Sequence, residues 1–527
     1  MIKIRGMSSW ITGEKFVVID KGDATARVPL QEFSGRSPGV FKLIGLQGVV
    51  LIKRKDMDYV LDQAAELKFF PEGKLIEGIG WSAPYFALPD GTVMSPEGVE
   101  PPQIAFGRMA NKCSQAGSLK GWKKHVAAPL TGHMLAMFVL MLAFMPPLLR
   151  LSTNMGNIGF ELVGGKGIGK STIQQLVASI LGATGHGEDG NYWITFNTTL
   201  NALETAMAAH SDLPMILEEA NLFFAGETAA KRASAMKALA FKLSAGDEKE
   251  RYGMRSAGHY RFAYLSSSNE PLTDLIGKSS DVAKAASDRL ITLTIGADRR
   301  YGVFDRFPEE CESASIFAAQ LTAAATKNHG KAMRRYLQRL VNARAADEKL
   351  LRARIRNYQS AFRRKARVDA NSGSAVRVAD AFGLVYAAGC LAQAYGALPK
   401  SFECGLAVLH CYQLSLSATL PARAFADRLR ELASDQQTVA DDASLSRRQV
   451  SASTAFLRRK ASGSEILIRS AMITTVFPDW ATLRKQADVQ ALSKGEAGHR
   501  TVKRSLGRNK EVERVFCFTL PPQNAHE

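Results

Sequence analysis

FELVGGKGIGKSTIQQLVASIL, residues Phe160–Leu181, predicts a strand, a glycine-rich loop and a helix in direct succession. The apolar run 158–163 is followed by glycines, and the segment after them has apolar residues at helical spacing and no proline. This order is the context in which a glycine-rich loop binds phosphate, because the helix begins where the loop ends. A glycine-rich turn without a ligand is the alternative, and the flanking strand and helix argue against it.

The loop fits the pattern G-x-x-x-x-G-K-[ST]. Its glycines let the backbone adopt positive φ, so that consecutive N–H groups can converge on phosphate oxygens. Lys170 would reach the β- and γ-phosphates of ATP, and the Ser171 hydroxyl would ligate Mg²⁺, with Thr172 as a second hydroxyl. The predicted nucleotide-binding residues are Gly164, Gly165, Lys166, Gly167, Ile168, Gly169, Lys170, Ser171 and Thr172.

The composition is that of an ordinary globular protein, with 46% hydrophobic and 22% charged residues. The formal net charge of +18 points to a polyanionic partner. The six cysteines are scattered without a C-x-x-C pair or a histidine at ligand spacing, which favours a reducing cytoplasm over a disulfide framework or a zinc site. We expect no signal peptide, because the residues after 1–5 are polar.

The apolar segment Met134–Leu149 is shorter than a membrane span, and Pro146-Pro147 breaks its end. It predicts a buried core helix and no membrane partner.

Four domains are predicted along the chain: 1–105 strand-rich, 106–300 a P-loop ATPase core, 301–435 helical and basic, and 436–527 winged-helix-like. In the first, the β-prone runs are 16–19, 49–52 and 85–88, separated by proline- and glycine-containing turns. In the second, helical and strand patterns alternate, which predicts an α/β fold with a parallel sheet and crossover helices.

A second apolar strand, 213–217, ends in Glu218-Glu219, 48 residues after Lys170. Carboxylates at the carboxyl end of a parallel strand lie in the crevice where ligands bind. We therefore expect Glu218 in the Mg²⁺ shell and Glu219 as the base that polarises the attacking water. An ordinary solvated strand end is the alternative.

A third strand, 260–265, leads into a polar segment in which Asn269, or Ser268 in its place, could orient water against the γ-phosphate. An asparagine in a turn before proline is the competing interpretation. Arg289 precedes a further apolar run, 291–295, and could act as an arginine finger in a neighbouring subunit. A surface ion pair with Asp288 competes with that role.

Basic residues gather in four places that are candidates for nucleic-acid contact. The segment 331–367 carries thirteen Lys or Arg against Asp347 and Glu348, and it predicts one amphipathic helix. The loop 246–258 is either a channel-facing DNA contact or a basic surface loop. In the final segment, 451–460 predicts a helix, and 501–504 with 512–520 predict a two-stranded basic wing. The individual candidates are Lys249, Arg251, Arg255, Arg458, Arg459, Lys460, Arg504, Arg508 and Lys510.

Several segments together resemble the domain-of-unknown-function family 927, which occurs on phages and integrative elements and is described as helicase-like. The similarity runs from about residue 15 to 420. It implies an AAA+-like ring ATPase that acts on DNA, and the one departure is Glu218, where the family pattern has Asp. The matching segments are Gly80-Trp81, Phe86–Asp90, Gly121-Trp122, Trp193–Thr195, Leu203-Glu204, LPMILEEAN, LSSSNEPL and Arg289-Leu290.

Residues and resemblance together predict an ATP- and Mg²⁺-dependent, ring-forming motor of the additional-strand class that acts on single- or double-stranded DNA. The expected assembly is a homo-oligomer, with a hexamer as one arrangement. An ATP-gated assembly factor, such as a helicase loader or a defence switch, is the alternative from another class. Charge alone leaves an RNA-directed ATPase open as a third.

Overall fold

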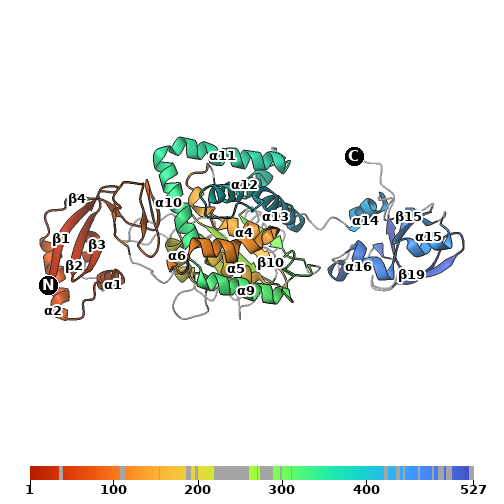
Figure 1. Ribbon diagram of the computed structural model, residues 1–527, viewed down its shortest axis with the longest axis horizontal. Coiled ribbons are helices and arrows are strands. Elements are labelled where there is room, and N and C mark those ends of the chain that lie inside the picture. Colours follow the sequence, from red (N-terminus) through yellow and green to blue (C-terminus); the bar gives the residue numbers. More distant parts are fainter. Residues whose placement is uncertain are drawn as a thin grey trace. The chain divides into compact units, whose positions relative to one another are not determined.

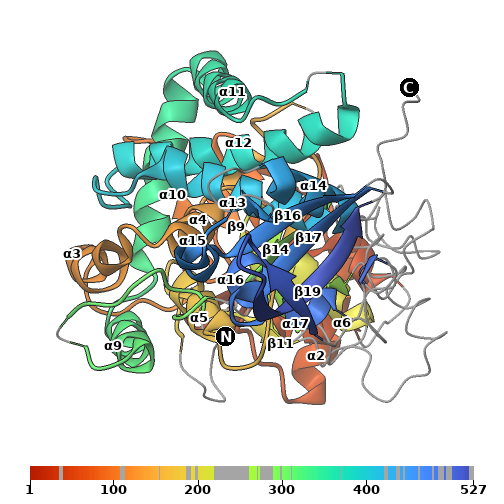
Figure 2. The same cartoon turned by 90° about the vertical axis from the view of Figure 1, so that its right-hand side faces the viewer.

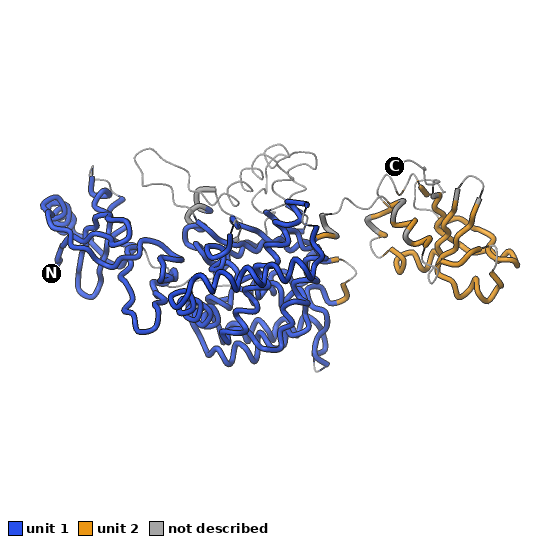
Figure 3. The backbone as a smooth tube through the Cα atoms, turned by 90° about the horizontal axis from the view of Figure 1, so that it is seen from above, with its two compact units in different colours: residues 1–295, 301–415 blue, residues 296–300, 416–527 orange. Residues whose placement is uncertain are grey.

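The computed structural model describes a defined part of the 527-residue chain, which divides into two compact units (Figure 3). One unit comprises residues 1–295 and 301–415, and the other 296–300 and 416–527. The described residues are 1–34, 39–106, 113–153, 155–184, 192–195, 200–218, 260–269, 271–272, 289–296, 299–309, 311–369, 371–419, 425–434, 439–442, 445–460, 463–477, 480–484, 489, 492–493 and 501–520.

A four-stranded sheet of order β3-β2-β1-β4 begins the chain. The run 16–19 is apolar throughout because both faces of β2 are buried: Val17 and Ile19 pack in one cluster, and Phe16 and Val18 in another. Two helices that the sequence did not predict, α1 and α2, contribute to the first cluster, and the predicted strand 49–52 is a loop between them. The elements are β1 (Ile2–Ser9), β2 (Lys15–Lys21), β3 (Ala24–Pro29), α1 (Gly39–Leu46), α2 (Arg54–Glu66) and β4 (Glu72–Gly73).

Two small sheets follow, of which the three-stranded one, β6-β7-β8, contributes to the main core, whereas Leu75 and Ile76 of the two-stranded one pack in smaller clusters. Phe86 and Leu88 are fully buried in that core, and the Trp81 ring packs edge-on against Phe86 at 5.1 Å. Their strands are β5 (Leu75–Ile76), β6 (Gly80–Ser82), β7 (Tyr85–Ala87), β8 (Val93–Met94) and β9 (Gln103–Ile104). The strand-rich character predicted for the first hundred residues is confirmed.

The central sheet is parallel, as predicted, and its order is β11-β12-β13-β10-β14. Figure 1 labels strand β10 of this sheet. Its strands are β10 (Ile158–Val163), β11 (Ile194–Thr195), β12 (Pro214–Glu218), β13 (Ala263–Ser268) and β14 (Leu290–Thr294). Every residue of β10 is buried. Because β13 lies between β10 and β12, the strand that carries the glycine-rich loop and the strand that carries Glu218 are separated by one additional strand.

The predicted core helix is confirmed as α4 (Met134–Leu142). Its residues 135–142 are buried, and Phe138 contacts Phe160 of β10 and Phe382 at 5.3 Å each. The other helices of this region are α3 (Leu119–Trp122), α5 (Lys170–Ala178), α6 (Leu200–Ala209) and α9 (Ala314–Lys327).

The single basic helix predicted over 331–367 is wrong, because two helices occupy that range. Asp347 has extended backbone, which ends the first helix, and its carboxylate caps the second by accepting a hydrogen bond from the Leu350 N–H at 2.9 Å. The helices are α10 (Lys331–Ala346) and α11 (Glu348–Lys365), followed by α12 (Gly373–Ala394) and α13 (Cys404–Thr419). Helices α11 and α12 pack along one another (Figure 2).

Helix α12 is long and apolar enough to span a membrane by length and composition. The share of its apolar window that is buried inside the protein is 61%, and Phe382 packs against Phe138 of α4. A helix in the core of a protein meets the same length and composition criteria and is buried in the same way.

The second unit contains a five-stranded sheet of order β15-β16-β17-β19-β18. The predicted antiparallel pair is confirmed as β18 and β19. The helix predicted over 451–460 is wrong: α15 ends at Ala452, and the rest is strand β16, whose Phe456 is fully buried. The elements are α14 (Phe425–Ser434), β15 (Val439–Asp441), α15 (Arg447–Ala452), β16 (Ala455–Lys460), β17 (Gly463–Arg469), α16 (Ile473–Val476), α17 (Trp480–Leu483), β18 (Val502–Leu506) and β19 (Glu511–Leu520).

Candidate functional site

The glycine-rich loop joins the carboxyl end of β10 to the first residue of α5, Lys170. Gly167 and Gly169 have φ of +76° and +93°, a region that favours glycine. A Cβ atom on Gly169 would lie 2.7 Å from Cγ2 of Val303, which is held against the loop by a 2.9 Å hydrogen bond from its N–H to the Ile168 carbonyl. Position 169 therefore requires glycine for two independent reasons.

A cavity of about 600 Å³ opens above this loop. It brings together the predicted loop residues with Asn269 and Ser268, the two side chains proposed from the sequence at the tip of the third strand. Its lining consists of Lys166, Gly167, Ile168, Gly169, Lys170, Ser171, Thr172, Ser267, Ser268 and Asn269. Donors from a loop, a helix N-terminus and a neighbouring strand tip thus face one space, which is the arrangement that holds a triphosphate.

The Lys170 ammonium lies at the centre of this lining. Its Nζ donates to the carbonyls of Gly164 at 2.6 Å and Gly165 at 2.7 Å, and to Oδ1 of Asn269 at 3.3 Å. Partial burial lowers its pKa below the ordinary lysine value, because desolvation disfavours the charged form. A phosphate in the cavity would offer this ammonium a stronger, charged acceptor than the carbonyls it now uses.

Glu161 is a buried carboxylate in β10 that the sequence analysis did not identify. It has no exposed surface, and it accepts hydrogen bonds from Ser268 Oγ at 2.7 Å, Leu272 N–H at 3.2 Å and Thr292 Oγ1 at 3.5 Å. Ser268 and Leu272 lie on either side of Asn269 in the chain, and Thr292 lies in the neighbouring strand β14. Glu161 therefore holds the segment that presents Asn269 to the cavity. The sequence did contain one sign of this residue's role, because Glu161 is the only charged residue in the apolar run 158–163.

Gln174, on the buried face of α5, is a second residue that the sequence analysis missed. Its Nε2 donates to the carbonyls of Leu217 at 3.0 Å and Leu265 at 3.5 Å. Its Oε1 accepts no hydrogen bond from the described residues. The side chain ties the first turns of α5 to β12 and β13, whose carboxyl ends lie at the same edge of the sheet as the cavity.

The predicted acidic pair is described only in part. Glu218 is the half-buried last residue of β12, at the same edge of the sheet as the cavity but outside its lining. Glu219 lies outside the described residues. Among the described residues, no three His, Cys, Asp or Glu side chains group as metal ligands. A Mg²⁺ ion held by the Ser171 hydroxyl, one carboxylate, water and phosphate oxygens needs no such group, so the residues present fit it.

Arg289 is exposed and immediately precedes β14. Its carbonyl accepts a hydrogen bond from the Gly159 N–H at 2.7 Å, so it lies at the amino edge of the sheet. The strand between that edge and the cavity edge spans about 16 Å at ~3.3 Å per residue. Arg289 is therefore too far from the cavity of its own chain to contact a phosphate there.

The basic candidates of the second unit differ in their surroundings. Arg458 is only 25% exposed: its Nε donates to Asp442 at 2.7 Å and its Nη2 to the Ser505 carbonyl at 2.6 Å, so it ties β16 to β18. Arg459 is exposed at the end of β16, Arg504 is half-buried, and Arg508 and Lys510 are exposed in the turn between β18 and β19. The side chain of Lys460 and the loop candidates Lys249, Arg251 and Arg255 lie outside the described residues.

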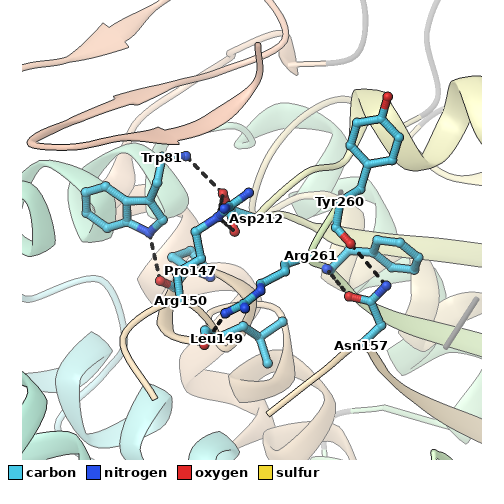
Figure 4. A network of polar contacts seen from close by, with 9 residues as sticks. Trp81, Pro147, Leu149, Arg150, Asn157, Asp212, Tyr260 and Arg261 are labelled. Carbon is cyan, nitrogen blue, oxygen red and sulfur yellow. Dashed lines mark hydrogen bonds and ion pairs between the residues drawn. The ribbon is translucent and has the colours of Figure 1, made fainter. Parts of the chain in front are cut away.

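A polar network lies at the opposite, amino edge of the sheet (Figure 4). The buried Asp212 accepts from Arg150 Nε at 2.8 Å and from the Trp81 N–H at 2.9 Å, while the Trp81 indole donates to the Pro147 carbonyl at 2.8 Å. Burial raises the pKa of Asp212, and Arg150 opposes that shift. Nearby, Asn157 bonds the backbone on both sides of Arg261. The network attaches the β6 hairpin to the starts of β12 and β13.

Comparisons with known proteins agree with this fold. The model of the family described as "Domain of unknown function (DUF927)" matches residues 41–254, which confirms the resemblance noted in the sequence. No curated protein matches the chain.

Among solved structures, the chain is similar to one described as SCCmec type IV Cch, active helicase. The TM-score is 0.55 and the identity 15%, over 98% of this chain and 93% of that chain. Identity this low shows a shared fold alone. The apo A form of the NrS-1 C-terminal region and JCV helicase match with TM-scores of 0.24 and 0.22 and identities of 9% and 12%; they cover 61% and 41% of this chain and 64% and 60% of those chains.

Proposed function

From the DUF927 match over residues 41–254 and the phosphate-binding geometry of the cavity, we propose that this chain is an ATP-hydrolysing, DNA-dependent, helicase-like motor of a phage or mobile element. The observation that carries the proposal is the convergence of Lys170 and Asn269 on one cavity at the carboxyl edge of a parallel sheet. In sheets of this kind, ligands bind at that edge.

Each residue then has a distinct task. The loop N–H groups and Lys170 hold the β- and γ-phosphates of ATP, and Ser171 and Glu218 complete the shell of Mg²⁺, which neutralises charge on the phosphates when bound. Glu219 accepts a proton from the attacking water, and Asn269 orients that water. Arg289 acts on the nucleotide of a neighbouring subunit, which accords with its place at the amino edge of the sheet. A closed ring of identical subunits, a hexamer for example, supplies such a neighbour.

The net charge of +18 supports DNA as the partner, and the scattered cysteines without a C-x-x-C pair support a reducing cytoplasm as the setting. In the proposed four-domain organisation, the winged-helix-like terminal module binds the DNA backbone through exposed residues of its hairpin. Arg508 and Lys510 are better placed for this than Arg458, which is engaged by Asp442. Replacing Arg504, Arg508 and Lys510 by Gln should lower the salt dependence of DNA binding, and replacing Arg458 should mainly destabilise the module.

One experiment tests the proposal. ATP turnover and oligomeric state are measured with the full chain alone and with single-stranded DNA, duplex DNA or RNA, with Lys170→Ala as the inactive control. Turnover that DNA stimulates supports the motor. Oligomers that form on ATP addition with negligible turnover identify an ATP-gated assembly factor instead. Stimulation by RNA alone identifies an RNA-directed ATPase.

A further inference from the structure

A second, smaller cavity of about 330 Å³ lies at the carboxyl end of α11, in the helical part of the first unit. Three of its six lining residues are arginines. The lining consists of Ser360, Arg363, Arg364, Arg367, Val368 and Val376. No residue of the ATP cavity contributes to it. Its arginines belong to the basic segment 331–367, in which the sequence analysis named no individual residue as a contact.

Two of the three arginines are not neutralised by the residues that the structure describes. Arg363 is paired with Asp380, with 3.4 Å between Nε and Oδ1. The side chains of Arg364 and Arg367 are exposed and have no hydrogen-bond or ion-pair partner among the described residues. The next acidic residue, Asp369, accepts from the Asn371 N–H at 2.9 Å within its own loop. Asp369 keeps its negative charge but is not part of the lining, so the three lining arginines with the one paired carboxylate of Asp380 give a local excess of two positive charges.

Arg367 also has an unusual backbone. Its φ is +50°, in the left-handed region that favours glycine, at the position after a helix where glycine is the common residue. The turn is closed by hydrogen bonds from the N–H groups of Arg367 and Val368 to the carbonyls of Arg364 and Arg363. The helix dipole accounts for cations in the last turn of α11, but it does not account for an arginine where the backbone itself disfavours one.

We propose that this arginine cavity binds a backbone phosphate of nucleic acid. Two exposed arginines, Arg364 and Arg367, line one cavity together with Ser360, whose hydroxyl accepts a hydrogen bond from Arg363 Nη2 at 3.5 Å. Planar guanidinium groups are well suited to the paired oxygens of a phosphodiester. The proposal deepens the proposed function, on which it rests, by naming one place where the strand is held.

The test measures binding of the full chain to a fluorescent oligo(dT) strand by anisotropy over a range of KCl concentrations. Arg364→Gln with Arg367→Gly should weaken binding and reduce the slope of log affinity against log salt by up to about 1.4, at ~0.7 per phosphate contact on single strands. Arg367→Gly alone should raise the thermal unfolding midpoint while it weakens binding, since glycine relieves the backbone cost. A purely structural role of Arg367 cannot produce that pair of opposite changes.

Arg54→Gln, at an exposed arginine of α2 that belongs to none of the candidate nucleic-acid contacts, is the matched control for loss of one charge and should leave the slope near the wild-type value. An equal loss of slope in this control, or a double variant with an unchanged slope, overturns the proposal. So does competition in which inorganic phosphate displaces oligo(dT) from the double variant as effectively as from wild type. If the wild-type chain itself neither hydrolyses ATP nor binds DNA, the proposed function is refuted instead.

Discussion

Lys170 Nζ lies 3.3 Å from Oδ1 of Asn269, although 99 positions of the chain separate the two residues. The contact joins the helix that follows the glycine-rich loop to the tip of the adjacent strand β13. A phosphate that draws the Lys170 ammonium toward itself would break this hydrogen bond and release the Asn269 side chain. Occupation of the cavity would therefore change the hydrogen bonding at the tip of β13.

Asn269→Ala should therefore leave ATP binding close to wild type and lower turnover, because Lys170 and the loop still hold the phosphates while the attacking water loses its positioning group. A loss of about 10²-fold is the lower end of what a positioned group contributes. Fluorescent-nucleotide binding and phosphate release measure the two quantities. Lys170→Ala should lose both, and wild-type turnover in Asn269→Ala would remove Asn269 from the mechanism.

Glu161→Gln should slow hydrolysis without weakening nucleotide binding. The amide has one acceptor oxygen in place of two and turns an N–H group toward donors that need an acceptor, so we expect a stability loss of about 1–3 kcal/mol. Denaturant unfolding and turnover check this. Thr292→Val removes only the 3.5 Å bond and should cost less. Equal effects of the two substitutions would contradict the role assigned to the carboxylate.

Gly169→Ala should abolish nucleotide binding, since its φ of +93° disfavours alanine by roughly 1–2 kcal/mol and the added methyl meets Val303. Gly165→Ala is the matched control, because a Cβ atom there has no neighbour within 4 Å. Calorimetric titration with a non-hydrolysable ATP analogue should show wild-type affinity for Gly165→Ala. A similar affinity for Gly169→Ala would refute the geometric argument.

Arg289→Ala should lower turnover by about 10³–10⁵-fold and leave ATP binding intact, if its guanidinium stabilises transition-state charge in a neighbouring subunit. Glu219→Gln should likewise bind ATP without hydrolysing it. Mixtures of the two variants should recover part of the activity, because an intact base and an intact finger then meet at some interfaces. Mixed oligomers without recovered turnover would exclude action in trans.

Asp212→Ala should destabilise the first unit by about 1–3 kcal/mol, because the Trp81 N–H and the half-buried Arg150 lose their buried acceptor. Asp212→Asn retains an acceptor and tolerates the φ of +57°, so it should cost less. Thermal unfolding ranks the two variants. If Asp212→Ala unfolds at the wild-type temperature, the network in Figure 4 contributes nothing measurable.

The same carboxyl group should also contribute to the pH dependence of stability. Burial raises its pKa, so the folded chain holds this proton more tightly than the unfolded chain does. The contribution to stability is therefore full below the ordinary aspartate pKa and is lost as the pH rises through the raised value. Asp212→Asn should lack this component, and unfolding free energies measured across mildly acidic pH would reveal the difference.

Much of the fold follows from local patterns. The strand–loop–helix at 158–181, the parallel strands and the buried helix α4 were all predicted. Their signals, an apolar run or a glycine spacing, lie within the same few consecutive residues that form each element. The break at Asp347 was missed even though its signal is also local: an aspartate that caps the next helix was taken as one charge in a basic segment. The helix predicted over 451–460 failed because Phe456 and its neighbours are compatible with either a helix or a strand, and pairing with β17 decides between them.

The sequence by itself determined the glycine-rich loop between β10 and α5, since consecutive residues supply its glycines, lysine and hydroxyl. Only the tertiary structure decided what surrounds that loop. The strand order puts β10 between β13 and β14, and this places Glu161 against Ser268 and Thr292, 107 and 131 positions away. Likewise, folding commits Arg458 to Asp442 and leaves Arg364 and Arg367 exposed at one cavity. The partner of a polar group depends on which strands become neighbours, and no local spacing encodes that choice.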